Sequence, residues 1–197
     1  LGERPQQGEL EGGEVGRTPG DDHRHPLGVD AQIALGHRPF CLVTAHRREN
    51  VGSPLERICQ GLTRFAVAHP KVPILFPVHP NGSIGRIVIR LLSAVPSVLL
   101  LPPLNYLFFL FLLKRCRFVV TDSGGVQEEA AVLRKDLVIT RDTTERPEVL
   151  NPLSTFLVGS CPTRLADTAT AILRRQSAGR PAASHYWNGL GAGDASL

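Results

Sequence analysis

Three short polar motifs contain the residue types from which chemistry is expected. The first, HRRE at residues 46–49, combines an imidazole, two guanidiniums and a carboxylate. Guanidiniums suit bidentate phosphate binding and His titrates near neutral pH, so this motif could hold a diphosphate and stabilise it as it leaves. The alternative is a solvated turn with a local ion pair.

The second motif, TDSGGVQEE at residues 121–129, has the pattern of a strand end, a small-residue turn and a helix start. Glycines let the backbone approach a ligand, and the free N–H groups and dipole of a helix start favour an anion such as a diphosphate. Glu129, about one turn into the helix, could accept hydrogen bonds from the two hydroxyls of a ribose. The alternative is a plain N-cap by Asp122 or Ser123.

The third motif, RDTTERPE at residues 141–148, concentrates charges and hydroxyls. Arg146 could contact phosphate, and Glu145 or Thr143 could contact a sugar. The alternative is a Thr or Asp N-cap before a short helix with Pro near its first turn.

Two further groups of polar residues have weaker patterns. His79 precedes the turn signal PNG, where a lone His is more often structural than functional. Asp21, Asp22, His23 and His25 have metal-ligand side chains, but their segment offers no supporting residues that would orient them. We therefore expect no metal site.

The elements that must position these motifs follow an alternating pattern. Short apolar runs with β-branched residues predict strands at 40–44, 74–78, 97–101, 118–121, 137–140 and 155–158. Longer segments with three- and four-residue apolar spacing predict helices at 54–68, 84–93, 106–115, 126–133 and 164–176. This order indicates an α/β fold, a doubly wound, Rossmann-like parallel sheet covered on both faces. Ligands bind such sheets beyond the carboxyl ends of the strands, where all three motifs lie.

Length and composition limit the possible classes. A chain of 197 residues with 42% hydrophobic residues can bury one good core. Its 22 basic residues exceed its 18 acidic ones but are scattered, which suits a small anionic ligand and not nucleic acid. The four Cys are widely spaced, which indicates a reducing, cytoplasmic setting. The apolar run at 98–113 is broken by Pro102 and Pro103 and is too short for a membrane span.

The ends of the chain differ from its middle. Residues 1–38 have no helical or strand period, so we expect a disordered or non-native leader there. The Rossmann-like domain is expected at residues 39–180, and an irregular C-terminal tail is expected at residues 181–197. The sequence has no Met and starts at Leu1, so we interpret it as a fragment.

His46 and Ser123 also permit a different hypothesis, a trypsin-like serine protease. That class needs an all-β double barrel, a triad Asp and an oxyanion hole. The alternation of strands and helices argues against it.

Taken together, five motifs resemble the non-hydrolysing UDP-N-acetylglucosamine 2-epimerases. They are VTAHRREN (43–50), PVHPN (77–81), PLNY (103–106) and the motifs at 121–129 and 141–148. The resemblance covers about residues 40–160, the second of the family's two Rossmann-like domains. It implies half of a GT-B-type architecture with the substrate between two domains, no cofactor and a homodimer in the complete enzyme. The implied reaction interconverts UDP-N-acetylglucosamine and UDP-N-acetylmannosamine by elimination and re-addition of UDP.

The resemblance also implies roles for single residues. The acids that move the carbon 2 proton belong to the family's first domain, which this chain lacks, so we expect the isolated chain to be inactive. The roles implied within the chain are His46 as the catalytic residue near the leaving diphosphate, Phe109 beside uracil, Ser123, Gly124 and Gly125 on phosphate, Glu129 on ribose, Arg146 on the diphosphate, and His79 at a possible regulatory site for a second UDP-N-acetylglucosamine.

The chain departs from the family pattern after Glu129. The family commonly reads APSLGKP, whereas residues 130–136 read AAVLRKD. Replacing a C-cap Gly by Arg134 would cost about 1 kcal/mol if that residue must adopt positive φ. Two other hypotheses therefore stay open: an inactive UDP-binding remnant, and half of a GT-B-type glycosyltransferase.

Overall fold

Six short parallel strands form one sheet in the computed structural model, which describes residues 38–78 and 82–178. Their order across the sheet is β3-β2-β1-β4-β5-β6. The strands are β1 (Cys41–Thr44), β2 (Ile74–Pro77), β3 (Val98–Leu101), β4 (Phe118–Thr121), β5 (Asp136–Ile139) and β6 (Thr155–Leu157).

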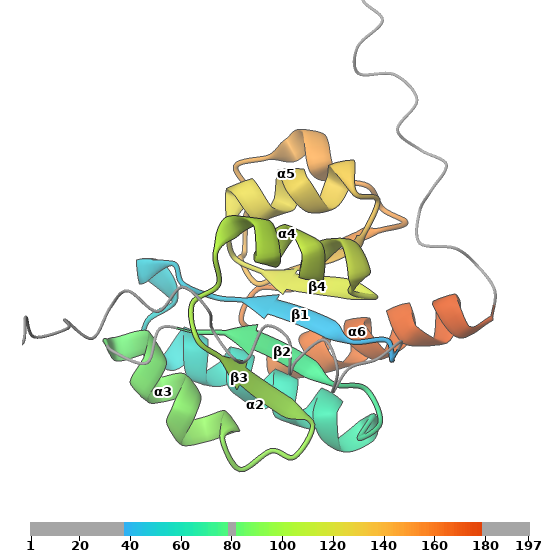
Figure 1. Ribbon diagram of the computed structural model, residues 1–197. Helices are drawn as coiled ribbons and strands as arrows, with labels where there is room; N and C mark the ends of the chain where they lie inside the picture. The colour runs from blue at the N-terminus through green and yellow to red at the C-terminus, as the bar shows by residue number, and fades with distance from the viewer. Residues whose placement is uncertain (1–37, 79–81, 179–197) are drawn as a thin grey trace, which may run out of the picture.

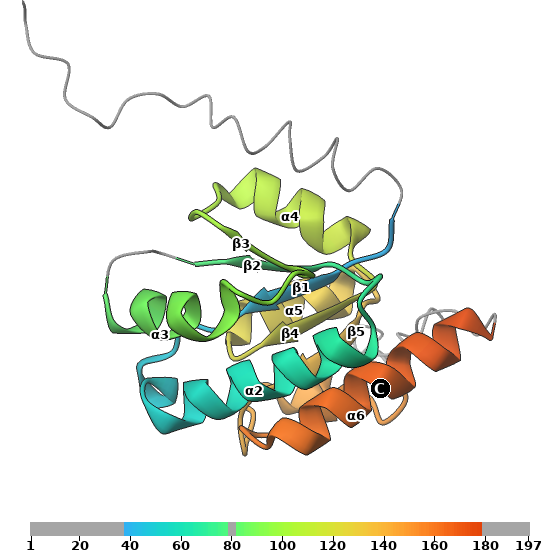
Figure 2. The same ribbon diagram turned by 90° about the horizontal axis from the view of Figure 1, so that it is seen from below.

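Helices cover both faces of this sheet (Figure 1). α2 (Ser53–Ala68), α3 (Ser83–Leu92) and α6 (Pro162–Ser177) lie on one face. α4 (Tyr106–Arg115) and α5 (Gly124–Val132) lie on the other. Figure 2 shows α2 and α6 packed side by side across the first face. Two single 3-10 turns, η1 (Arg48–Asn50) and η2 (Pro147–Val149), follow β1 and β5.

The strands are mostly apolar because helices cover both faces of the sheet; the polar exceptions are Asp136 in β5 and one Thr in each of β1, β4 and β6. Successive side chains of a strand point to opposite faces. Cys41 and Val43 accordingly lie in the core under α2, α3 and α6, whereas Phe40 and Leu42 lie in the core under α4 and α5. Two apolar layers thus hold the central strand rigidly between them.

The predicted Rossmann-like fold is confirmed. All six strands and five α-helices occur where the patterns predict them, with boundaries that differ by at most two residues. α5 begins at Gly124, two residues earlier than expected, so the glycine pair lies inside the first helical turn. The all-parallel sheet excludes the serine-protease alternative.

Arg134 is the one non-glycine residue with positive φ in the described part of the chain, at 54°. Its N–H donates to the Ala131 carbonyl, and the Lys135 N–H donates to the Ala130 carbonyl. This pairing is a Schellman motif with Arg at the position that favours Gly, as the sequence comparison predicted.

Several expectations fall outside the described residues. They concern nearly all of the leader at 1–38, the tail at 181–197, His79, and the Asp21, Asp22, His23 and His25 group. Within the described ranges, no helix has the length and apolar character that crossing a membrane requires. The same ranges hold no group of three or more His, Cys, Asp or Glu side chains arranged to hold a metal ion.

Candidate active site at the ends of β1, β4 and β5

The loops after β1 and β4 meet where the sheet order reverses direction. β1 and β4 are neighbours, paired from Cys41↔Phe118 to Thr44↔Thr121. The helices that follow these strands, α2 and α5, lie on opposite faces (Figure 1). Such a switch point is where doubly wound sheets bind ligands.

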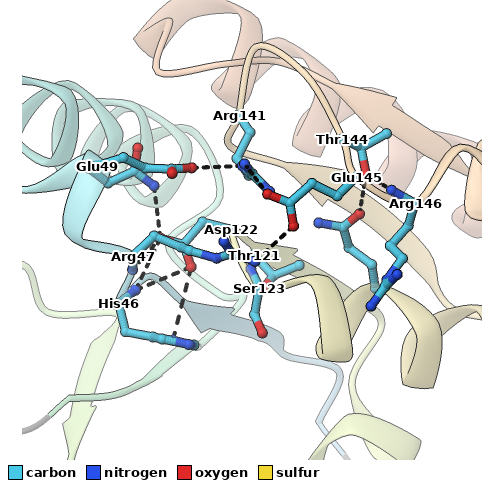
Figure 3. Close-up of polar contacts among 12 residues, drawn as sticks. His46, Arg47, Glu49, Thr121, Asp122, Ser123, Arg141, Thr144, Glu145 and Arg146 are labelled. Atoms are coloured by element: carbon cyan, nitrogen blue, oxygen red, sulfur yellow. Dashed lines mark hydrogen bonds and ion pairs between the residues drawn. The ribbon is translucent and has the colours of Figure 1, made fainter.

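Asp122 fastens the loop after β1 to the end of β4. This fully buried carboxylate accepts hydrogen bonds from the His46 N–H at 3.1 and 3.2 Å, the Arg47 N–H at 2.9 Å and Asn50 Nδ2 at 2.8 Å. Asp122 is therefore not a helix cap, as the simpler alternative proposed, because its acceptors face the neighbouring loop (Figure 3). Its role is to fix the backbone that carries His46 and Arg47.

No side chain caps the first turn of α5. Ser123 takes the N-cap position with extended backbone, and its side chain makes no capping hydrogen bond. A Cβ added to Gly124 would lie 3.6 Å from Arg47 Nη2 and 3.8 Å from Arg146 Nε. Guanidiniums from two other loops thus stand over the positive end of the helix, which is an arrangement suited to an anion.

Carboxylates pair with the arginines of this cluster, and Glu145 joins Arg47 to Arg141 (Figure 3). Glu145 lies 3.5 Å from Arg47 Nη2 and 3.1 Å from Arg141 Nη2. Arg141 Nε lies 2.8 Å from Glu49, and Arg146 Nε lies 2.5 Å from Glu128. The hydrogen bond from Arg141, with the charges of Arg141 and Arg47, lowers the pKa of Glu145. Glu49 thus pairs with Arg141 of another loop.

Thr144 joins the loop after β5 to α5. Its hydroxyl donates to the buried Gln127 Oε1 at 2.7 Å and accepts from the Arg146 N–H at 3.0 Å. Pro147 begins η2 immediately afterwards, as the short-helix alternative predicted, but the N-cap residue is Arg146 without a side-chain cap, and not the Thr or Asp of that alternative. The short 3-10 turn at Pro147 and the position of Arg146 beside the first turn of α5 therefore occur in the same loop.

His46 lies at the rim of this cluster. Its side chain is 62% exposed, and its Nδ1 lies 4.0 Å from Asp122 Oδ1. The imidazole is thus accessible to a ligand held at the α5 turn while its backbone is fixed by Asp122.

A second part of the site lies between α4 and α5. Tyr106 Oη donates a hydrogen bond to Glu129 Oε1 at 2.9 Å. A largely apolar groove of about 480 Å³ begins there and is lined by Tyr106, Leu107, Leu110, Phe111, Lys114, Glu128, Glu129, Val132 and Leu133. Phe109 is half-buried against the core under α4 and α5 and is not among these lining residues.

A smaller polar cavity of about 320 Å³ lies beyond Arg141. Its lining is Glu49, Asn50, Pro54, Thr140, Arg141, Asp142, Thr143 and Ser160. Thr143, a possible sugar contact, therefore faces this cavity. Sequence reasoning named Arg47 and Arg141 only within their motifs and missed Tyr106 as a partner of Glu129.

The sequence model of one family, described as UDP-N-acetylglucosamine 2-epimerase, matches residues 21–196. The chain belongs to this family. A probable UDP-N-acetylglucosamine 2-epimerase of Ralstonia solanacearum is 46% identical over 82% of this chain and 43% of its own length. The Escherichia coli K12 enzyme is 40% identical over 80% of this chain and 42% of its own. The chain thus spans about two fifths of the length of these relatives.

Solved structures agree with this assignment. The UDP-GlcNAc 2-epimerase of Neisseria meningitidis, bound to UDP-GlcNAc, is 34% identical with a TM-score of 0.68, over 72% of this chain and 38% of that one. An Escherichia coli heptosyltransferase with ADP is 17% identical with a TM-score of 0.51, over 69% of this chain and 43% of that one, which shows a shared fold alone. The similarity therefore favours the epimerase over the glycosyltransferase alternative.

Proposed function

We propose that this chain supplies the UDP-sugar-binding half of an enzyme that interconverts UDP-N-acetylglucosamine and UDP-N-acetylmannosamine. One observation carries the proposal: Arg47 and Arg146 converge on the uncapped first turn of α5. A diphosphate at this turn would meet the backbone of Ser123, Gly124 and Gly125 together with two guanidiniums.

The nucleoside then extends along α5. Glu129 is one turn and a half beyond Gly124, and its carboxylate would accept hydrogen bonds from the ribose hydroxyls. Phe109, on the neighbouring α4, remains our prediction for a contact with uracil.

Elimination places negative charge on the leaving diphosphate. A base removes the proton from carbon 2, the electron pair forms the double bond to carbon 1, and the bond from carbon 1 to the diphosphate oxygen breaks. Arg47, Arg146, the helix turn and His46 stabilise the charge that develops on that oxygen. Return of the proton to the opposite face of carbon 2, with re-addition of UDP, completes the inversion.

We assign the groups that move the carbon 2 proton to the other domain of the complete enzyme. The relatives' greater length and the fold's position in a two-domain architecture support this assignment. The complete enzyme is proposed to be a homodimer that needs no cofactor, as the family resemblance implies, and to be cytoplasmic, as the wide spacing of the four Cys indicates. The regulatory role of His79 also stays a prediction.

The test is an epimerisation assay on the purified chain, alone and with the separately expressed first domain of the Ralstonia relative. We expect turnover only in the mixture, and a loss of about 100-fold or more in the His46→Asn variant, the range found when one group that stabilises developing negative charge is removed. Arg90→Gln, which removes an exposed arginine paired with Glu56 on the opposite face of the sheet, should leave turnover unchanged. Turnover by the chain alone would contradict the two-part assignment.

A further inference from the structure

The contact between Tyr106 and Glu129 joins two helices at the point where the nucleoside would leave the helix turn. Tyr106 is the first residue of α4, and Glu129 lies in the middle of α5. Their hydrogen bond of 2.9 Å is a side-chain contact between residues 23 positions apart. Both side chains line the groove between the helices.

The carboxylate of Glu129 has unused acceptor capacity. Oε1 accepts from the Tyr106 hydroxyl, whereas Oε2 is buried without a hydrogen-bond partner among the described residues. An ionised carboxylate has about four acceptor sites, so one donor leaves most of them empty. A carboxylate oxygen removed from water without a donor is costly, and a ligand that brings hydroxyl donors relieves that cost.

Tyr106 limits how this carboxylate can turn. The last torsion of a Glu side chain has a broad energy profile, so an untethered carboxylate samples many orientations. A donor fixed on α4 holds Oε1, which restricts rotation of the carboxylate and so fixes the direction in which Oε2 can accept. The local backbone supports the donor, because the Asn105 side chain caps α4 by accepting from the Phe108 N–H at 2.9 Å.

We propose that Tyr106 is a positioning residue that orients the Glu129 carboxylate for a vicinal diol and so makes the site selective for ribonucleotides over 2′-deoxyribonucleotides. This inference rests on the proposed function, because it requires the nucleoside of a UDP-sugar to lie along α5. The hydrogen bond to Glu129, followed by partial desolvation and the carboxylate charge, raises the pKa of Tyr106, which keeps the phenol protonated as a donor.

The test measures the dissociation constants of UDP and 2′-deoxy-UDP for the whole chain by isothermal titration calorimetry. We expect the wild-type protein to prefer UDP by about tenfold, the worth of one hydrogen bond to a charged group. Tyr106→Phe should weaken UDP binding several-fold and leave 2′-deoxy-UDP binding unchanged, so that the preference nearly disappears. Val67→Ala, a change at an exposed position of α2 on the opposite face of the sheet, should keep the full preference.

A double-mutant cycle separates positioning from general damage to the fold. Tyr106→Phe combined with Glu129→Gln should lose no more preference than Glu129→Gln alone, since Tyr106 acts through that carboxylate. If Tyr106→Phe weakened the binding of UDP and 2′-deoxy-UDP equally, or left the preference for UDP unchanged, the inference would be overturned. The proposed function would still stand in that case, provided that the wild-type protein binds UDP. Absence of UDP binding by the wild type would overturn both.

Discussion

At the scale of single residues, the least expected feature is the buried carboxylate of Asp122, which fixes the position of the loop after β1. Asp122 looks in the sequence like a helix cap, because it precedes Ser-Gly-Gly at a helix start. In the fold its buried carboxylate instead faces the loop after β1 and accepts three of that loop's donors. Local sequence could not reveal this, because the donors lie more than 70 residues away.

Asp122→Asn should therefore damage the site as well as stability. The amide keeps one acceptor and turns two N–H donors toward backbone N–H groups, so we expect a loss of about 2–3 kcal/mol, the scale of hydrogen bonds to a charged group. Urea unfolding measures this loss, and UDP titration should show weaker binding. Asp167→Asn, at an exposed position on α6, is the matched control. An Asp122→Asn protein as stable as the control would contradict the anchoring role.

Replacing Arg134 by Gly is expected to stabilise the protein, in contrast to Asp122→Asn. Its φ of 54° places a Cβ where the left-handed conformation is strained. Arg134→Gly should raise the free energy of unfolding by about 1 kcal/mol, whereas Arg134→Ala keeps the Cβ and should give no gain. Chemical denaturation of the three proteins checks this. A stabilised Ala variant would show that the arginine side chain, and not the backbone, causes the strain.

At the scale of elements, α6 is held to the sheet by a buried charge. Asp136, at the start of β5 and fully buried, pairs with Arg175 and accepts from Gln176 Nε2 at 2.6 Å. Asp136 was noted in the sequence only as a departure from the family pattern. Its partners, 39 and 40 residues away on α6, were not predictable from spacing.

Arg175→Ala should destabilise the protein by about 3–5 kcal/mol, because it leaves the buried Asp136 carboxylate without its charged partner. Arg174→Ala, at the exposed position next to it, should change stability by less than about 0.5 kcal/mol. Thermal unfolding of the two variants under identical conditions makes the comparison. Equal melting temperatures would mean that the ion pair does not anchor α6.

Element positions were predictable because the strands of a doubly covered sheet are mostly short apolar runs. The site was predictable in part, since motifs at neighbouring strand ends must meet at one edge of the sheet. The arrangement within the site was not. Periodicity does not say that Arg47 and Arg146 stand over Gly124, or that Tyr106 reaches Glu129, because these contacts depend on how long side chains turn in the folded molecule.

At the scale of the whole molecule, the described chain is one Rossmann-like unit of its family, for which we propose nucleotide-sugar binding. Its sheet carries the recurring strand order of doubly wound nucleotide-binding domains, and its loops gather basic groups at the switch point. The chain matches less than half the length of these relatives. We therefore expect UDP binding to be measurable on this chain by itself, whereas turnover requires the other domain as well.

The most direct measurement is UDP titration of the wild-type chain and of Gly124→Ala. Ala is tolerated at this helical position, because its Cβ would lie at ordinary contact distances of 3.6 and 3.8 Å from two guanidiniums. That methyl group would occupy the space proposed for the diphosphate. The account predicts that the wild type binds one UDP, and that Gly124→Ala unfolds at the same temperature but binds UDP at least tenfold more weakly. Equal UDP affinity in the two proteins, or no binding by the wild type, would contradict it.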